Sequence, residues 1–476
     1  MRLPVASHIM AAEELGAVHF VGIGGAALSG LARLMVARGI RVSGSDAQDS
    51  PLLHSLTALG VACFVGHHAS QVRGADTVVV SAAVGADNPE VVQALADSLR
   101  VWPRSAAVQS LLLGHRAVVV TGTHGKTTTT SMLVTALLAA GADPSYAIGS
   151  TLTSSGLNAA AGSDPLFVAE GDESDAAILV YSPYGAVVTN VDVDHLDFFG
   201  SARAYAEVFD AFLLRVEDGG FCVCGVDDPG GRRLAGRSLD VGLRTTTVGT
   251  SSAATMRAVD IRSGEQGSTS SLLLDGRPMG ELTLRVPGPV YVVDAVAALA
   301  AGLELGYGFD DLARGLASFR GSSRRMESKG TRGGIRVYDS YAHHPAEIQA
   351  DLRAARALAG RSRVVVCFQP HLFSRTHVLG AEMGVELAAA DVTVVMDVYA
   401  AREGPKDGIS GAIVADAAAA AGGEVVYEPA RSRVVDRLVD LTRQGDLLLT
   451  LGAGDVTDIG PLVLARLGEL RQKEQG

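Results

Sequence analysis

Short apolar runs that lead into a glycine turn and then into a helical pattern recur along the chain. The run that begins at His19 predicts a buried strand, and the leucine spacing in the stretch 26–38 predicts a helix after it. A run and turn of the same kind begin at Ala117, and a third series of apolar runs begins at Ile335. Strands that alternate with helices are typical of a parallel sheet covered by helices, so the pattern predicts an α/β fold.

The same pattern divides the chain into three parts. Further strands are expected at 42–46, 77–81, 166–169, 186–190, 364–367, 392–397 and 447–451. Residues 248–286 alternate in places between apolar and polar side chains, which predicts a small antiparallel patch. With boundaries near 112 and 320, we expect domains at 1–112, 113–320 and 321–476.

Composition and charge narrow the class of protein. A chain of 476 residues is long enough for about three domains, and 47% hydrophobic residues suffice for buried cores. The net charge of −12 excludes a general attraction to nucleic acid or to anionic lipid. No apolar run approaches the ~18 residues that span a bilayer, and Glu13 and Glu14 stand where a signal peptide would be apolar. We therefore expect a cytoplasmic protein that binds neither nucleic acid nor membrane.

The first glycine turn, Gly22-Ile-Gly24-Gly25, joins the strand at His19 to the following helix. Glycines at this place allow backbone amides at a helix N-terminus to approach a diphosphate closely. Asp46 stands 21 residues after Gly25, about where a carboxylate meets a ribose hydroxyl in a dinucleotide fold. The turn is compatible with a nucleotide site, with an NAD-dependent dehydrogenase and with a purely structural turn.

The second turn contains Gly125-Lys126-Thr127 between an apolar strand and a helix. In a P-loop, such amides and the lysine ammonium hold the β- and γ-phosphates, and the threonine hydroxyl ligates Mg²⁺. The preceding glycine is Gly122, which makes this loop shorter than the general pattern. Lys126 is one of only four lysines in the chain, so its place at a strand-to-helix junction favours a phosphate site over a chance match.

Two acidic segments follow predicted strands of the central domain. Glu170-Gly-Asp-Glu173-Ser-Asp175 comes after one strand, and Asn190-Val-Asp-Val-Asp-His195 comes after the next. Carboxyl ends of parallel strands meet at one edge of a sheet, so both segments are expected near the phosphate loop. Oxygen ligands suit Mg²⁺, whereas a histidine is an uncommon ligand for it and is also compatible with a capping or core role.

Basic and aromatic residues gather at predicted strand ends in the third domain. The segments are Arg324-Arg325, Asp339-Ser-Tyr341-Ala-His343-His344-Pro345, Gln369-Pro-His371-Leu-Phe-Ser-Arg375-Thr376 and Gly452-Ala-Gly454-Asp455. Guanidinium and imidazole groups so placed suit a small substrate with a carboxylate, together with a phosphate in transfer. Each of them alone would also fit a structural role, so their shared position at strand ends is what favours a binding site.

Taken together, these segments resemble the Mur ligases, from about His19 to beyond Asp455. The most specific stretches are 121–130, 194–197, 341–345 and 369–376. The resemblance implies an α/β protein of three domains: an N-terminal Rossmann-like domain that binds a UDP-sugar, a central P-loop ATPase-like domain with a parallel sheet and a small antiparallel patch, and a C-terminal Rossmann-like domain that binds an amino acid. It favours a UDP-sugar over NAD at the first glycine turn.

The resemblance implies an ATP-dependent amide ligation. It is strongest to the members that join L-alanine to the carboxylate of UDP-N-acetylmuramate through an acyl phosphate, in peptidoglycan precursor synthesis. The cofactors would be ATP and Mg²⁺. The partners would be these small-molecule substrates, and the protein would be a monomer or a homodimer.

The same resemblance assigns the site residues. The catalytic residues would be Lys126, Asn190, His195, His343, His344 and Arg375. ATP would be held by Gly122, Thr123, His124, Gly125, Lys126, Thr127, Thr128, Tyr291, Asp294, Arg325 and Asp339. The UDP-sugar would be held by Gly22, Gly24, Gly25, Ser45, Asp46 and Ser81. Alanine would be held by Tyr341, His343, His344 and Arg375, and the metal by Thr127, Glu173 and His195.

The resemblance also separates the members of the family from one another. Several relatives bridge metals with a carbamylated lysine, but residues 113–320 contain only Lys126, which is already assigned to phosphate. The peptide-recycling ligase, which attaches a whole tripeptide to the same sugar, shares the P-loop and the His-His-Pro stretch. The segment 369–376 favours the ligase that adds a single alanine.

Some positions depart from the family pattern. After Gly288, the residues that hold adenine are replaced by Pro289, Val290, Tyr291 and Asp294. Tyr291 is able to stack on adenine and Asp294 to accept from its amine. Ser340 stands where an aspartate is common. A relative that binds the UDP-sugar but uses ATP poorly is therefore an alternative.

Overall fold

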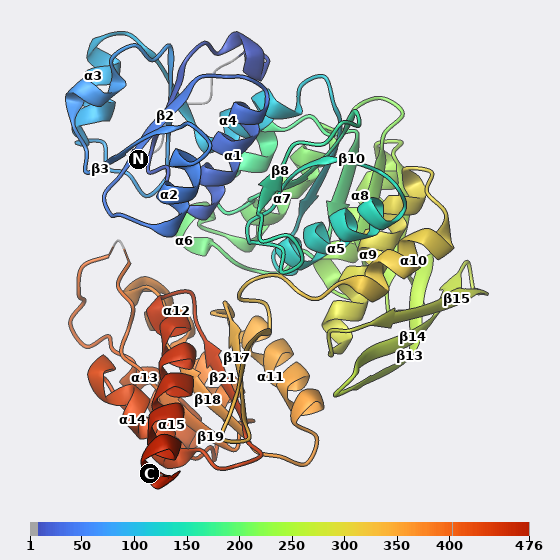
Figure 1. The fold of residues 1–476 in the computed structure, drawn as a ribbon. Helices are drawn as coiled ribbons and strands as arrows, with labels where there is room; N and C mark the ends of the chain where they lie inside the picture. Colours follow the sequence, from blue (N-terminus) through green and yellow to red (C-terminus); the bar gives the residue numbers. More distant parts are fainter. Residues whose placement is uncertain (1–7, 402, 476) are drawn as a thin grey trace. The chain divides into compact units, whose positions relative to one another are not determined.

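Three sheets organise the chain, which the computed structural model describes over residues 8–401 and 403–475 (Figure 1). Helices connect many of the parallel strands that follow one another along the chain. The α/β class that the hydrophobic pattern predicts is confirmed.

The first sheet is parallel throughout, with the strand order β3-β2-β1-β4-β5. Its strands are β1 (Val18–Val21), β2 (Val42–Asp46), β3 (Ala62–Val65), β4 (Thr77–Val80) and β5 (Arg100–Pro103). Its helices are η1 (Ala12–Glu14), α1 (Ala26–Ala37), α2 (Pro51–Thr57), η2 (Ala69–Val72), α3 (Pro89–Ala96) and α4 (Arg104–Leu112). Because β1 is the central strand, the turn after it lies between the ends of β2 and β4.

The second sheet has the order β15-β14-β13-β12-β11-β10-β6-β9-β7-β8. Its strands are β6 (Arg116–Thr121), β7 (Ser145–Ala147), β8 (Ala159–Ala160), β9 (Leu166–Glu170), β10 (Gly185–Val188), β11 (Phe221–Gly225), β12 (Arg244–Gly249), β13 (Met256–Gly264), β14 (Gly267–Leu274) and β15 (Arg277–Leu284). Its helices are α5 (Lys126–Ala139), η3 (Ala177–Val180), α6 (Leu196–Phe199), α7 (Ala202–Leu213), α8 (Pro229–Asp240), α9 (Pro289–Glu304) and α10 (Phe309–Ser318).

Two features of this second sheet bear on function. Strand β6 pairs in parallel with β9 on one side and β10 on the other, so the loop after β6 is flanked by the segments that follow both neighbours. Strands β13, β14 and β15 are joined by two-residue connections, which makes them antiparallel hairpins. The antiparallel patch predicted within residues 248–286 is therefore confirmed.

The third sheet has the order β16-β17-β21-β18-β19-β20, with only β16 antiparallel to its neighbour. Its strands are β16 (Glu327–Arg332), β17 (Ile335–Ser340), β18 (Val364–Phe368), β19 (Val392–Val395), β20 (Val425–Tyr427) and β21 (Leu447–Leu451). Its helices are α11 (Pro345–Ala359), α12 (Phe373–Leu387), α13 (Ala412–Ala420), α14 (Arg431–Leu441), η4 (Asp455–Asp458) and α15 (Ile459–Gln475).

The chain divides into two compact units. The first unit comprises residues 1–259, 271–282 and 293–319, and therefore holds the first sheet and most of the second. The second unit comprises 260–270, 283–292 and 320–476, which includes the whole third sheet. Strands β1, β4 and β10 are buried at every position, as expected for parallel strands covered on both faces.

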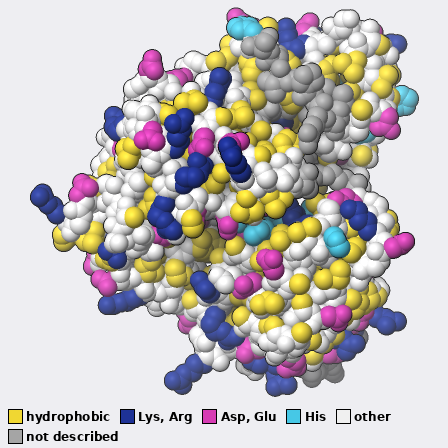
Figure 2. Space-filling model, turned by 180° about the vertical axis from the view of Figure 1, so that it is seen from behind, with side chains coloured by type: hydrophobic (Ala, Val, Ile, Leu, Met, Phe, Trp, Pro, Cys, Tyr) yellow, Lys and Arg dark blue, Asp and Glu magenta, His cyan; other side chains and the backbone are white. Residues whose placement is uncertain are grey.

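The surface carries charges of both signs. On the face seen in Figure 2, Lys and Arg side chains are interspersed with Asp and Glu. Along the described residues, no helix has both the length and the hydropathy needed to cross a bilayer. The four cysteines are free thiols, and three of them, Cys222, Cys224 and Cys367, are buried in strands.

Candidate active site

The phosphate loop is the four-residue connection 122–125 between β6 and α5. Gly122 and Gly125 have φ values of 128° and 81°, in the left-handed region that favours glycine. A Cβ at Gly125 would lie 2.5 Å from Oδ1 of Asp294, which places the Asp294 carboxylate against the loop. The structure thus brings together one residue of the altered adenine segment and the N-terminus of α5.

Side chains that follow β10 fix the backbone of this loop. Asn190 accepts from the backbone amide of His124 through Oδ1 and donates to its carbonyl through Nδ2, both at 2.9 Å. Thr189 donates to the same carbonyl at 2.5 Å. The Thr123 hydroxyl lies 2.9 Å from the Tyr205 hydroxyl. Asn190, predicted as a catalytic residue, has its amide engaged with the loop in this structure.

Lys126 is the first residue of α5, and its ammonium group folds back over the loop. Its Nζ donates to the carbonyls of Gly122 at 2.7 Å and Thr123 at 3.0 Å, and it lies 2.9 Å from Oε2 of Glu173. Burial disfavours the charged ammonium, but the nearby carboxylates, above all Glu173, outweigh burial and raise the pKa of Lys126. The lysine is held as a cation where phosphate oxygens would lie.

Oxygen ligands lie beside this cation. The Thr127 hydroxyl donates to Oε1 of Glu170 at 2.9 Å, and Glu173 is fully buried. Nε2 of His195 lies 3.6 Å from Oε1 of Glu173. Burial lowers the pKa of His195, but the Glu173 and Asp194 carboxylates outweigh that effect and raise it.

These residues fit Mg²⁺ in their chemistry. A hydroxyl and two carboxylates are the hard oxygen ligands that Mg²⁺ prefers. Among the described residues, no group of three or more His, Cys, Asp or Glu side chains is arranged as a metal cluster. Glu170 belongs to this set; the sequence places it in an acidic segment near the loop but does not identify it as a metal ligand. Its position at the end of β9, paired with Val120 of β6, was the signal that could have identified it.

The first glycine turn is held by the end of β2. The amides of Gly22 and Ile23 donate to the carbonyl of Ser45 at 2.8 and 2.9 Å, and the amide of Gly24 donates to Oδ2 of Asp46 at 2.9 Å. The Ser45 hydroxyl is fully buried and donates to Glu90 at 2.8 Å. The Ser45 hydroxyl thus faces the interior in this structure, and the contact of Ser45 with the UDP-sugar stays a prediction. Ser81 lies at the same edge, after β4.

The third sheet gathers a second cluster at its strand ends. The ring of Tyr341 packs edge-on against His343 at 5.3 Å between centroids. The guanidinium carbons of Arg324 and Arg325 lie 4.9 and 5.5 Å from the centre of the Tyr341 ring. Nη1 of Arg375 lies 3.4 Å from Nδ1 of His371. Burial, together with Arg375 and Arg325, lowers the pKa of His343 to about 4 despite the opposing Glu347 carboxylate, so the imidazole is neutral near pH 7.

Two further residues of this cluster have structural contacts. Asp339 is fully buried and accepts from the hydroxyls of Thr450 at 2.6 Å and Thr457 at 2.7 Å. Nδ1 of His344 accepts from the amide of Ala346 at 3.4 Å and thereby caps α11. A helix cap explains this histidine, whereas His343 faces the basic and aromatic groups.

Tyr291, predicted to hold adenine, is a buried residue of the second unit. Its side chain is only 5% exposed and hydrogen-bonds Asp351, which belongs to the same compact unit. Little of the ring is exposed in this structure, and the stacking of adenine on Tyr291 stays a prediction. Asp294, on the next turn of α9, belongs to the other unit, with the phosphate loop.

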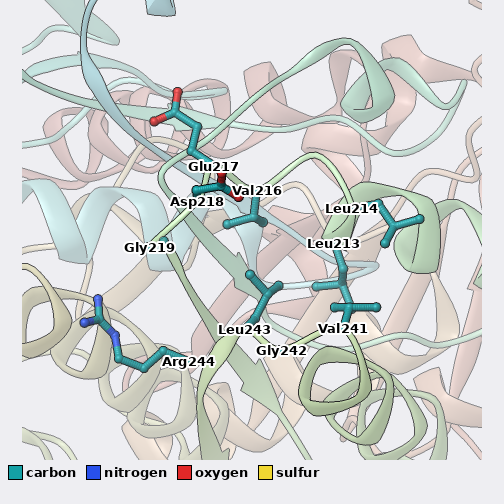
Figure 3. A pocket seen from close by; sticks show the side chains of 11 residues that line it. Leu213, Leu214, Val216, Glu217, Asp218, Gly219, Val241, Gly242, Leu243 and Arg244 are labelled. Carbon is teal, nitrogen blue, oxygen red and sulfur yellow. The ribbon is translucent and has the colours of Figure 1, made fainter.

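A cavity of about 410 Å³ lies elsewhere in the first unit (Figure 3). It is lined by residues before β11, including Leu213 and Val216, and by residues just before and at the start of β12, including Leu243 and Arg244. Figure 3 shows aliphatic side chains gathered in it, while the Glu217 carboxylate points away from them. The cavity therefore lies at the amino ends of β11 and β12, on the edge of the sheet opposite to the edge where the phosphate loop follows β6. No predicted site residue lines it.

Comparisons with known protein families cover most of the chain. Residues 17–116 match the Mur ligase family, catalytic domain. Residues 120–302 match the Mur ligase middle domain, and residues 324–454 match the Mur ligase, glutamate ligase domain. The three matches follow one another in the order of the three sheets.

Individual relatives match over their full length. A UDP-N-acetylmuramate–L-alanine ligase of Nocardioides sp. is 55% identical, across 98% of this chain and 100% of that protein. A protein of the same name from Kineococcus radiotolerans is 49% identical, across 98% and 99%. The crystal structure of a UDP-N-acetylmuramate–alanine ligase from Thermotoga maritima has a TM-score of 0.80 and 28% identity, across 95% and 99%. A murein peptide ligase from Psychrobacter arcticus shares the fold, with a TM-score of 0.71 and 22% identity, across 95% and 99%.

Proposed function

Because the chain belongs to the Mur ligase family, we propose that it uses ATP to join L-alanine to the carboxylate of UDP-N-acetylmuramate, a step of peptidoglycan precursor synthesis. The observation that carries the proposal is the phosphate loop, with Lys126 held as a cation beside Glu173. The 55% identity to an alanine ligase across the whole chain supports the choice of substrates.

The reaction proceeds in two transfers. A carboxylate oxygen of the sugar attacks the γ-phosphorus of ATP, and the bond from that phosphorus to ADP breaks, which gives an acyl phosphate. The amine of L-alanine then attacks the acyl carbon, loses a proton and expels phosphate as the C–O bond breaks. The first transfer is needed because a free carboxylate has no good leaving group.

The loop residues stabilise charge in the first transfer. The backbone amides at the N-terminus of α5 and the Lys126 ammonium hold the β- and γ-phosphates. Thr127 and Glu173, with Glu170 and His195 beside them, would hold Mg²⁺, which neutralises charge on the phosphate oxygens. Asn190 and Thr189 keep the loop in place, because both bind the backbone of His124.

We assign the amino acid to the strand ends of the third sheet. Arg375 would pair with the alanine carboxylate, and Tyr341 and the neutral His343 would line its amine end. Arg325 and Asp339 would contact ATP from this sheet. We propose the boundaries 1–112, 113–320 and 321–476 for domains that bind UDP-sugar, ATP and amino acid. The protein would act on soluble substrates in the cytoplasm, as a monomer or a homodimer.

The test is phosphate release by the purified protein. We expect release only when UDP-N-acetylmuramate, L-alanine, ATP and Mg²⁺ are all present. No release at saturating ATP would contradict the proposal and favour a relative that binds the UDP-sugar without turnover. Faster turnover with the tripeptide acceptor than with L-alanine would instead favour the peptide-recycling ligase. A comparison of ATP with GTP measures how well the altered adenine segment selects its base.

A further inference from the structure

A buried polar network lies beneath the first glycine turn, and none of the roles proposed above uses it. Its centre is Glu90 of α3, fully buried, as are His19 of β1 and Ser45 of β2. Nε2 of His19 lies 2.6 Å from Oε2 of Glu90, and the Ser45 hydroxyl donates to the same oxygen at 2.8 Å. Nδ1 of His67 lies 2.8 Å from Oε1 of Glu90. Three donors from three separate segments thus meet on one carboxylate.

The contacts define which atoms donate. Burial raises the pKa of Glu90, but the hydrogen bonds from His19, Ser45 and His67 outweigh burial and lower it, so the group is a carboxylate and accepts only. His19 therefore donates through Nε2, and its Nδ1, 2.8 Å from the hydroxyl of Ser43, accepts. His67 donates through Nδ1, which leaves Nε2 as its other polar atom.

The network connects His67 to the glycine turn. Ser45 contributes its hydroxyl to Glu90, and its carbonyl accepts from the amides of Gly22 and Ile23. Its hydroxyl also lies 3.0 Å from Nδ1 of His67. One residue therefore fixes the turn on one side and the imidazole on the other.

His67 lies at the edge of the sheet where a ligand would bind. It stands two residues after β3, and the amide of Gly66 donates to the carbonyl of Asp46 at 2.7 Å. In a parallel sheet the carboxyl ends of neighbouring strands form the binding edge, which here contains the turn, Asp46 and His67. The His67 side chain is 20% exposed, whereas Glu90 is fully buried. No hydrogen bond to Nε2 of His67 is found among the described residues.

We infer that His67 contacts the uridine diphosphate part of the substrate through Nε2, and that Glu90, His19 and Ser45 position its imidazole. The inference rests on the proposed function for the identity of the substrate. The phosphate oxygens, ribose hydroxyls and uracil of that group all offer partners to an imidazole nitrogen. Glu90 acts through His67 and does not touch the ligand.

The experiment measures UDP binding by calorimetry, and the KM for each substrate, in four variants. His67→Ala is expected to weaken UDP binding and raise the KM for the UDP-sugar about 10-fold or more, with unchanged KM for ATP and alanine. His67→Gln is expected to recover part of the loss, because its amide reaches the place of Nε2. His68→Asn is the matched control: this neighbouring histidine is exposed and caps η2, a role that asparagine keeps.

Glu90→Gln tests whether Glu90 positions the imidazole of His67. It is expected to raise the KM for the UDP-sugar while kcat is retained, and the double variant with His67→Ala is expected to be no worse than His67→Ala alone. Unchanged UDP binding in His67→Ala, or no UDP binding by the unaltered protein, would overturn the inference. If UDP binds and His67→Ala weakens it while no ligation occurs, the inference stands and the proposed ligation is wrong. Because the His67 side chain is partly exposed, His67→Ala remains a test even if Glu90→Gln does not fold.

Discussion

Glu90 and Glu173 are both fully buried glutamates near a glycine-rich turn, yet their partners differ in kind. Glu90 accepts from two imidazoles and a hydroxyl, all of which belong to the first sheet and its loops. Glu173 faces a lysine ammonium and an imidazole that the proposed reaction needs for phosphate and metal. We therefore assign Glu90 a positioning role, and we expect Glu173 to exchange partners when phosphate and metal bind.

The largest effect is expected from the cation beside Glu173. Lys126→Ala should lower kcat by about 1000-fold or more, because no other lysine lies in residues 113–320 to replace the ammonium at the phosphates. UDP binding should stay normal, since the first sheet holds that ligand. Steady-state kinetics and calorimetry measure the two effects. Lys406→Ala, at an exposed lysine, is the control, and loss of UDP binding in Lys126→Ala would indicate a folding defect.

Glu173→Gln should have the next largest effect on activity. The variant loses a carboxylate from the proposed metal site and the charge that opposes Lys126, so we expect the Mg²⁺ concentration for half-maximal rate to rise about 10- to 100-fold. A titration with Mg²⁺ at saturating substrates measures this shift. Glu170→Gln, which keeps the Lys126–Glu173 contact, should show a smaller shift. Equal Mg²⁺ dependence in Glu173→Gln and the unaltered protein would remove Glu173 from the metal site.

The two glutamates also show what the sequence could predict. Parallel sheets, the loop at Lys126 and the acidic segments after β9 and β10 follow from local patterns, because strand ends of parallel neighbours meet at one edge. The Glu90 network could not be predicted, since it joins residues far apart in the sequence by contacts that depend on side-chain direction. The inward hydroxyl of Ser45 was missed for the same reason.

The altered adenine segment gives the same lesson. Its residues Tyr291 and Asp294 are three positions apart on α9, and the sequence treated them as one ligand site. The structure buries the tyrosine beside Asp351 and sets the aspartate against Gly125. The amino-acid sequence of a segment does not show which of its side chains other parts of the fold will bury.

Stability distinguishes the two glutamates further. Glu90→Gln should lower the free energy of unfolding by about 1–3 kcal/mol, because the amide cannot satisfy three donors and brings a donor of its own. Glu173→Gln should lower it less, because the Lys126 ammonium keeps the carbonyls of Gly122 and Thr123 as acceptors and the nearby charge of Glu170. Urea denaturation of both variants measures the difference. A larger loss in Glu173→Gln than in Glu90→Gln would reverse the assignment of roles.

The smallest effect concerns Asp351. The donors and the cation near this buried carboxyl are too weak to keep it charged near neutral pH. Burial raises its pKa to about 7, although hydrogen bonds from Ser340 and Tyr291 and the charge of Arg325 oppose the rise. The folded protein therefore keeps a proton that the unfolded chain loses near its ordinary value of 3.8, so this group makes stability fall as the pH rises from about 4 to about 7.

Asp351→Asn removes that dependence. The variant should gain stability over the unaltered protein as the pH rises, on the order of 2 kcal/mol near pH 8, with little difference near pH 4. His343, whose pKa is lowered to about 4, gives the opposite slope, but it is present in both proteins and cancels in the difference. Urea denaturation at pH 4.5, 6 and 8 measures the trend. A difference that does not change with pH would show that Asp351 ionises as an ordinary carboxylate, held by Ser340 and Tyr291 as Glu90 is held by its three donors.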